Sequence, residues 1–170
     1  MAVNDLKVVN DRYSVLTFST DDRDTSGASA TLKPGEPVKK GGATSDFVML
    51  LADGEPTQIS AIFVGIVDTE STEAAAAEGE CKVKVVEGGT HIEGKAKTST
   101  TVDTQAEIND LKMNYVVFDH TSGAYTIDAA ATDDADANGL VILYGDPIKT
   151  TLVVGVHAGV TLYGTRSVAL

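Results

Sequence analysis

The chain has 170 residues, of which 42% are hydrophobic and 22% are charged, as is typical of one globular domain that folds without a metal ion or a disulfide. Its formal net charge of −12, from 25 acidic and 13 basic residues, argues against binding to nucleic acid or to an anionic membrane, because like charges repel. With 5% aromatic residues and no tryptophan, the core must consist mainly of valine, isoleucine, leucine and alanine, several of which favour β-sheets.

Residues 1–30 are predicted to form an extended N-terminal arm with one pairing strand. Apolar and polar residues alternate between Arg12 and Phe18, which is typical of a β-strand. The polar stretch 19–29 follows and has little reason to pack. The β-rich body is then expected to span residues 31–170.

Short apolar segments separated by glycine, proline and aspartate indicate further strands in the first half of the body. Residues 47–51 are a candidate for a buried strand, which a turn at 53–56 ends. Residues 59–67 are another, and Gly65 indicates a bulge or a close approach of the backbone there. The acidic, alanine-rich stretch 68–79 fits either a short helical turn or a loop.

Residues 81–86 alternate strictly at first, so the cysteine and two valines share one face of a strand and two lysines take the other. A turn at 87–90 follows, after which residues 91–97 are expected to run back. The alternation places Cys81 on the apolar face, where a buried, inert thiol is expected. As the single cysteine of the chain, it forms no internal disulfide.

One short helix is predicted near residues 104–112. Thr104 stands three residues before Glu107, as in a capping box, and apolar residues follow at helical spacing. Residues 115–119 and 124–128 are expected to form a hairpin. Further strands are expected at 140–144, 150–156 and 160–163.

Together these elements predict a mainly β fold. The expected architecture is a small mixed β-barrel of tulip-like shape, or a β-sandwich, with one short helix and an extended N-terminal arm. The longest apolar stretches, 47–52 and 61–67, are too short to span a bilayer, and no secretory signal is visible.

No arrangement of residues indicates an enzyme. The three histidines, His91, His120 and His157, are widely separated in the sequence, and none lies in a known nucleophile pattern. Both Gly-Gly pairs lead into extended segments, not into a helix that could bind phosphate. Carboxylates are plentiful, but nothing places two of them together in an apolar cleft. We therefore expect no catalytic residue and no cofactor.

One acidic stretch is a weak candidate for calcium binding. Asp134, Asp136 and Asn138 stand at alternate positions before Gly139, as in the first half of an EF-hand loop. The twelfth position is Gly145, however, where such a loop needs a bidentate glutamate. The alternative is an acidic loop with an Asn-Gly turn before a strand.

Several segments along the chain resemble sequences from one protein family. These segments are 33–42, 47–54, 63–68, 79–86, 101–108, 115–119 and 138–146. In them the sequence resembles the capsid decoration (cement) proteins of tailed bacteriophages, a family that includes the lambda-type head-decoration proteins. This chain is longer than the smallest members, so elements such as 68–79 or the helix are expected to be its own additions.

The resemblance implies a non-enzymatic virion protein, made in the host cytoplasm, that binds the outer surface of the capsid. It implies a homotrimer at three-fold or quasi-three-fold positions, where it bridges major capsid subunits and stabilises the head against the pressure of the packaged DNA. In lambda-type members the N-terminal arm becomes ordered by pairing with a capsid strand. The residues expected to do so here are Arg12, Tyr13, Val15, Leu16 and Phe18.

Two other classes of protein fit the same sequence. One is a different virion part, such as a head-fibre base or a tail-tube-like subunit, or a β-sandwich adhesin domain. A tube subunit should polymerise, whereas a decoration protein should stop at trimers. The other class is a small carbohydrate-active enzyme, against which the absence of tryptophan counts, because sugar sites usually use aromatic platforms.

Overall fold

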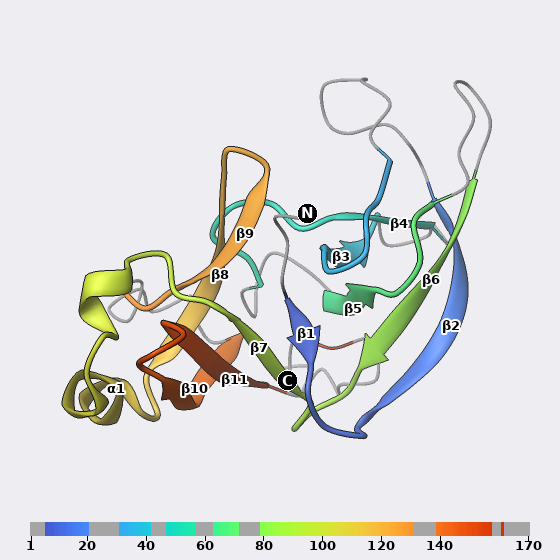
Figure 1. Cartoon of the computed structure of the whole chain (residues 1–170). Helices are drawn as coiled ribbons and strands as arrows, with labels where there is room; N and C mark the ends of the chain where they lie inside the picture. The colour runs from blue at the N-terminus through green and yellow to red at the C-terminus, as the bar shows by residue number, and fades with distance from the viewer. Residues whose placement is uncertain are drawn as a thin grey trace, which may run out of the picture.

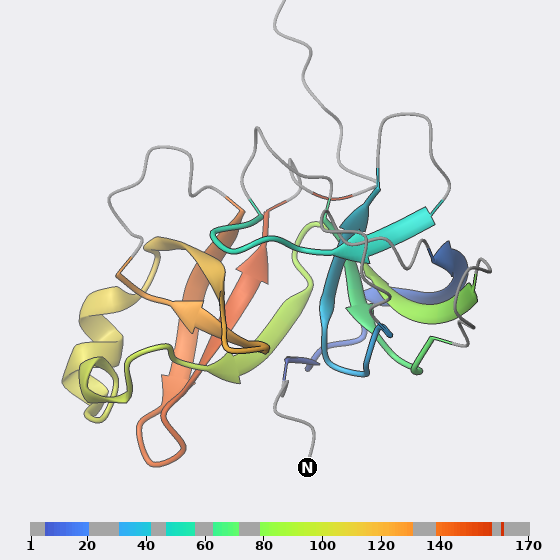
Figure 2. The same ribbon diagram turned by 90° about the horizontal axis from the view of Figure 1, so that it is seen from above.

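The computed structural model describes residues 6–20, 31–41, 47–56, 63–71, 79–130, 139–157 and 161 (Figure 1). It confirms the expected fold class, since the described residues form a small, mainly β body with one short helix. Seen from above, the helix, the strands that follow it and the strand just before it lie at one end of the molecule, and most of the earlier strands lie at the other (Figure 2).

The strands form a six-stranded sheet and a closed five-stranded barrel. In spatial order, the strands of the sheet are β1 (Lys7–Val8), β7 (His91–Lys95), β11 (Thr151–Val156), β10 (Leu140–Asp146), β8 (Tyr115–Thr121) and β9 (Ala124–Asp128). Those of the barrel are β2 (Tyr13–Thr20), β4 (Phe47–Leu50), β3 (Pro37–Lys40), β5 (Phe63–Val67) and β6 (Gly79–Val86). Among the named strands of the described residues, all pairs are antiparallel except that of β2 with β4.

The turn at 87–90 does not return the chain alongside β6, and the prediction that residues 91–97 run back is wrong. Strand β6 belongs to the barrel and β7 to the sheet. Instead, the segments β1–β2 and β6–β7 form one antiparallel ribbon that bends from the sheet into the barrel. Lys7 faces Glu93 and Tyr13 faces Val86, so six steps on one segment match seven on the other. The extra residue lies on the β6–β7 segment, which contains the turn at 87–90, where the N–H of Thr90 donates to the carbonyl oxygen of Glu87.

Side chains of both segments hold this corner, which we call the elbow. The amide of Asn10 donates to the carbonyl oxygen of Gly89 at 3.0 Å, and its Oδ1 accepts from the backbone N–H of His91 at 3.0 Å. The buried Thr90 hydroxyl donates to the carbonyl oxygen of Arg12. The two segments that pass between the sheet and the barrel are therefore held together at the elbow.

The strand expected between Arg12 and Phe18 is present as β2, but it is not part of a free arm. It pairs with β6 along all eight of its residues and is one of the five strands of the barrel. The described part of residues 1–30 is thus built into the body, while residues 21–30 lie outside the described residues. Alternation identifies a strand but not its partner, and the paired residues of β2 and β6 are 59 to 73 positions apart in the sequence.

One hydrophobic core joins the sheet to the barrel. Phe63 of β5 and Phe118 of β8 are fully buried and pack edge to face, with their ring centroids 5.9 Å apart. A second cluster fills the barrel and includes Cys81, which confirms its predicted place on the apolar face. Gly65 is also a close approach, as predicted, because an ideal Cβ there would lie 2.0 Å from the carbonyl oxygen of Lys84.

The predicted helix and hairpin are confirmed. Helix α1 (Gln105–Leu111) begins with the expected capping box of Thr104 and Glu107, and it buries Ile108 against the sheet. Strands β8 and β9 are joined at Ser122-Gly123, where both residues have positive φ. No helix in the described part of the chain is long and apolar enough to cross a membrane.

Several predictions fall wholly or partly on residues that the structure does not describe. For the strands expected at 47–51 and 59–67, it shows β4 and, from Phe63 onward, β5. Strands β10 and β11 confirm those expected at 140–144 and 150–156. Residues 72–78 lie outside the described residues, as does all of 160–163 except Thr161.

Candidate protein-binding surface

Strand β2 exposes apolar side chains on both of its faces. Residues directly opposite each other in a sheet share a face, and Leu16 lies opposite Val83, which is fully buried in the barrel. Val15 therefore points outward. Yet Val15 is 46% exposed and Leu16 is 39% exposed. A strand of a closed barrel normally buries its inner residues, so this part of β2 extends beyond the packed core.

Among the residues that the structure describes, one edge of β2 lacks a strand partner along most of its length. On the side away from β6, only Ser19 and Thr20 are paired, with the first residues of β4. Among the described residues, the segment from Tyr13 to Phe18 has no strand neighbour on that edge. Figure 1 shows β2 and β6 as a long curved ribbon at one side of the molecule. An open edge presents unpaired backbone groups with which another chain can form a sheet.

The five residues expected to bind a capsid strand thus lie on one segment but not on one face. Tyr13 and Val15 point outward, and the Lys84 ammonium lies 5.7 Å from the centre of the Tyr13 ring. Phe18 is half-buried against the barrel core. Arg12 is exposed at the elbow, where its carbonyl oxygen is bound by Thr90.

Two open grooves extend this surface from the barrel to the sheet. The elbow groove has a volume of about 660 Å³ and lies along the segment from Lys7 to Val15. The sheet groove, of about 280 Å³, shares Val9 with it and continues over Tyr144 and Lys149. Val9 and Tyr144 are both exposed. The sequence prediction missed these residues because alternation does not indicate which strand faces are covered.

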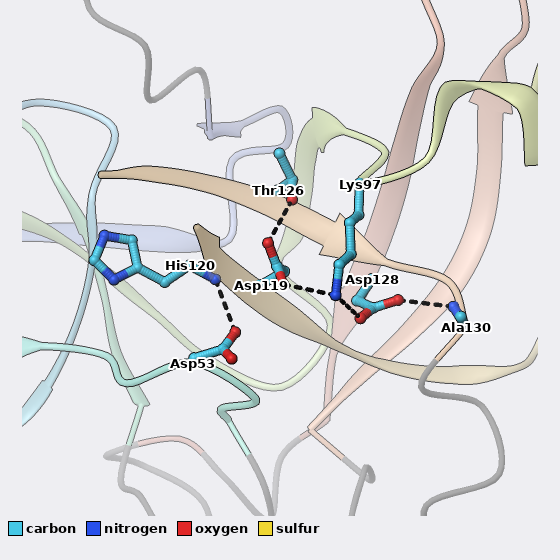
Figure 3. Close-up of polar contacts among 7 residues, drawn as sticks. All are labelled: Asp53, Lys97, Asp119, His120, Thr126, Asp128 and Ala130. Atoms are coloured by element: carbon cyan, nitrogen blue, oxygen red, sulfur yellow. Dashed lines mark hydrogen bonds and ion pairs between the residues drawn. The ribbon is translucent and has the colours of Figure 1, made fainter. Parts of the chain in front are cut away.

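A separate charged cluster lies where β7 ends beside the hairpin (Figure 3). The Lys97 ammonium lies 2.7 Å from the carboxylate of Asp119 and 2.8 Å from that of Asp128. Hydrogen bonds to the two aspartates raise the pKa of Lys97 above its usual value. Burial alone would raise the pKa of Asp119, but the hydrogen bonds that it accepts, chiefly from Lys97, outweigh burial and lower it.

This cluster is structural rather than reactive. The shifts favour a charged amine and a charged carboxylate, whereas a nucleophilic lysine must be neutral. The backbone supports the same role, because the N–H of Lys97 donates to the carbonyl oxygen of Ile127 at 2.9 Å and Ala96 forms a bridge with Ile127. Lys97 therefore attaches the outer strand β9 to the end of β7.

Polar residues also lie where the barrel meets the sheet. The carboxylate of the buried Glu55 accepts from the Lys39 ammonium at 2.7 Å and from the backbone N–H of Ala52 at 2.8 Å. The Tyr125 hydroxyl donates to the carbonyl oxygen of Leu51 at 2.5 Å. Burial, together with nearby carboxylates, raises the pKa of Tyr125. These contacts attach the loop after β4 to the sheet.

The three histidines have different neighbours in the structure. The His120 ring stacks on the Tyr125 ring, with the two centroids 4.3 Å apart. The backbone N–H of His120 donates to the carboxylate of Asp53 (Figure 3). His157 lies edge to face with Tyr115 at 6.4 Å. His91 is a residue of β7, in register with β11.

Within the described ranges, no group of three or more histidine, cysteine, aspartate or glutamate residues could hold a metal ion. Asp134, Asp136 and Asn138 lie outside those ranges, so the calcium hypothesis stays a prediction. Comparisons of the chain with protein families and with curated proteins give no match.

Proposed function

We propose that this chain is a non-enzymatic structural protein of a tailed-bacteriophage virion. It binds the outer surface of the capsid at three-fold or quasi-three-fold positions and stabilises the head by bridging subunits of the major capsid protein. The resemblance described above supplies the class of partner. It also supplies the expectation of a homotrimer. The net charge of −12 supplies the expectation that neither nucleic acid nor an anionic membrane is a partner.

The open edge of β2 is the observation that carries the proposal. Proteins usually protect long edge strands with charges, prolines or covering loops, because such edges pair with other chains. Here the segment from Tyr13 to Phe18 combines an unpaired edge, within the described residues, with exposed apolar side chains on two faces. A capsid strand that pairs with this edge gains main-chain hydrogen bonds, while its side chains contact Val15 on one face and Leu16 on the other.

A decoration protein needs no catalytic group and no tight single contact. Many copies act on one head, and a subunit that touches several capsid subunits gains avidity from weak contacts. This agrees with a surface made of strand edges and shallow grooves. Because β2 is a barrel strand, its capsid partner would extend an existing sheet instead of ordering a free arm.

Co-sedimentation with phage heads tests the proposal. The heads would be assembled without this chain from the major capsid protein encoded with it. Deletion of residues 1–18 is unsuitable, because it removes β1 and most of a barrel strand. We instead choose Val15→Asp, which places a charge on the exposed face and should leave the barrel folded. Met113→Asp is the matched control, since Met113 is 70% exposed and lies at the end of α1.

The expected result is binding of the unmodified protein and of Met113→Asp, with a loss of at least tenfold in affinity for Val15→Asp. Circular dichroism would verify that both variants are folded. Failure of the unmodified protein to bind heads would overturn the capsid function. Binding of Val15→Asp at full affinity would overturn the role of the β2 edge. Polymerisation of the purified chain into tubes would favour a tail-tube-like subunit.

A further inference from the structure

The part of β2 that lacks a strand neighbour, among the described residues, is limited at both of its ends. At one end Ser19 and Thr20 already pair with β4, and at the other end β2 begins at Tyr13, directly after the elbow. A partner strand can therefore pair with six of the eight residues of β2, those from Tyr13 to Phe18. At about 3.3 Å per residue, this segment is about 20 Å long. It fits one short extended segment of another chain.

The face of this segment that turns toward the barrel interior is apolar. Leu16 lies opposite the buried Val83, and Phe18 lies opposite the buried Cys81. Phe18 packs against the core cluster of the barrel, whereas Leu16 is 39% exposed. A side chain of a partner strand on this face would lie beside Leu16, and an apolar side chain there would remove Leu16 from water. The interior face thus favours apolar side chains in the partner.

The outer face of the same segment carries positive charge. Residues 13–18 pair with residues 81–86, and in these two stretches Lys82 and Lys84 are the only charged residues. The two lysines flank the buried Val83 on β6, so both point away from the barrel interior. In a chain with a net charge of −12, this outer face is a local exception.

Lys82 is the lysine that is available to a partner. The Lys84 ammonium lies 3.0 Å from the carboxylate of Asp68, which partly neutralises its charge. Lys82 is exposed and has no ion pair within the described part of the chain. It lies opposite the short, exposed Thr17, so its long side chain can extend across β2 toward the open edge. A carboxylate of the partner beside Thr17 would attract Lys82, whereas a lysine there would be repelled.

We infer that the segment bound at the β2 edge is an extended strand in which acidic and apolar side chains alternate. Its apolar side chains lie beside Leu16 on the interior face, and its carboxylates lie on the outer face beside Thr17, within reach of Lys82. The inference rests on the proposed function, since it describes the capsid segment that would pair with β2. An acidic partner is repelled by the net charge of the chain and attracted by these lysines, so charge restricts where and in which register it binds.

Two synthetic peptides test the inference without phage heads. One alternates valine with glutamate over six residues and the other alternates valine with lysine. Both are acetylated and amidated, so that their ends carry no charge. Titration of the isotope-labelled protein at physiological salt, followed by NMR, gives the affinity of each peptide and the backbone amides that it contacts. The glutamate peptide should shift the amides of residues 13–18 and should bind about fivefold more tightly than the lysine peptide.

Substitution of Lys82 tests the origin of this preference. Lys82→Glu should reverse it, because the new carboxylate repels the glutamate peptide and attracts the lysine peptide. Lys82→Gln, a milder change, should abolish it. Lys112→Glu is the matched control, since it changes the net charge by the same amount as Lys82→Glu at an exposed position at the end of α1, and it should keep the preference. Circular dichroism would verify that the variants are folded.

Three results would each overturn the inference. These are equal binding of the two peptides, no binding of the glutamate peptide, and an unchanged preference in the Lys82 variants. Shifts confined to amides outside residues 13–18 would count as no binding at this edge.

The outcome is separable from that of the capsid proposal. In the co-sedimentation experiment, Lys82→Glu should bind heads about fivefold more weakly than Lys112→Glu. Heads that bind both variants equally would overturn the acidic strand and leave the capsid function standing. Binding of the glutamate peptide at residues 13–18, with no binding of the unmodified chain to heads, would overturn the capsid function. The preference of the β2 edge for an acidic strand would then remain.

Discussion

The outer strands of the six-stranded sheet differ from β2 of the barrel in how far their edges are covered. In the sheet, β9 is attached to the residues after β7 by the N–H of Lys97, by the bridge from Ala96 and by the ion pair between Lys97 and Asp128. The other outer strand, β1, has only two residues. In the barrel, the eight-residue β2 is paired on its outer side only at its last two residues, among those described. The sheet has protected edges, whereas the barrel leaves one edge available.

This difference separates residues that hold the fold from residues that are free to bind. Where an edge is covered, side chains such as Asp119 stabilise the structure. Where it is left open, side chains such as Val15 contribute little to folding and are available to a partner. Substitutions should therefore change stability most in the shared core and least on β2.

The largest loss of stability is expected for Phe118→Ala. Phe118 is fully buried and packs against Phe63 of the barrel, so its removal leaves a cavity between the two regions. Loss of a buried phenylalanine typically costs about 3–5 kcal/mol. Urea unfolding followed by circular dichroism measures this. Tyr115→Ala, on the same strand but exposed, should cost less than about 1 kcal/mol. Equal effects of the two variants would show that the regions share no core.

Asp119→Asn should have the next largest effect and should depend on pH. The Asp119 side chain is 6% exposed and binds Lys97, so loss of its charge should cost about 1–3 kcal/mol at neutral pH. The pKa of Asp119 in the folded protein lies below its ordinary value of 3.8. Its carboxylate therefore stabilises the fold above that value, and this stabilisation is lost as the pH falls toward the folded-state pKa.

Urea unfolding at neutral and at acidic pH checks the sign. The difference in unfolding free energy between the unmodified chain and Asp119→Asn should be largest at neutral pH and should shrink in acid. Asp110→Asn, at an exposed position of α1, should show little difference at either pH. A difference that grows in acid would contradict the assignment of Asp119 as a stabilising carboxylate.

Local signals in the sequence predicted the elements whose causes are local. Thr104 and Glu107 lie three residues apart, and their capping box begins the helix as expected. The alternation from Cys81 onward correctly assigned the two faces of β6. A side-chain period of two is a property of one strand, so a single segment is enough to reveal it.

Features that join distant segments could not be predicted in this way. Nothing near Tyr13 indicates that its partner is Val86, and nothing near Lys97 indicates that Asp119 and Asp128 will surround it. The extra residue at the elbow follows from the registers of two segments, so neither segment alone contains the information. For the binding surface, the sequence identified β2 as a strand but not its open edge.

A smaller loss is expected for Asn10→Ala at the elbow. The substitution removes two hydrogen bonds between the two segments that connect the sheet and the barrel. It should lower the free energy of unfolding by about 1–2 kcal/mol. Asn109→Ala is a suitable control, because Asn109 is exposed and bonds only locally with Gln105 in its own helix. It should cost about 0.5 kcal/mol or less. Urea unfolding measures both. An Asn10→Ala effect no larger than that of the control would show that the Asn10 hydrogen bonds do not hold the elbow.

The smallest change in stability is expected for Val15→Ala on the open strand, within about 0.5 kcal/mol. Val83→Ala, on the neighbouring strand but fully buried, should cost about 1–3 kcal/mol by the same urea measurement. The two substitutions remove the same atoms from one ribbon, so only the difference in burial separates them. If Val15→Ala were as costly as Val83→Ala, the outer face of β2 would be part of the core, and the contrast between protected and open edges would fail. If it leaves stability unchanged but weakens binding to heads, the fold does not require an apolar residue there. Binding would then be the physical reason for exposing valine to water at that position.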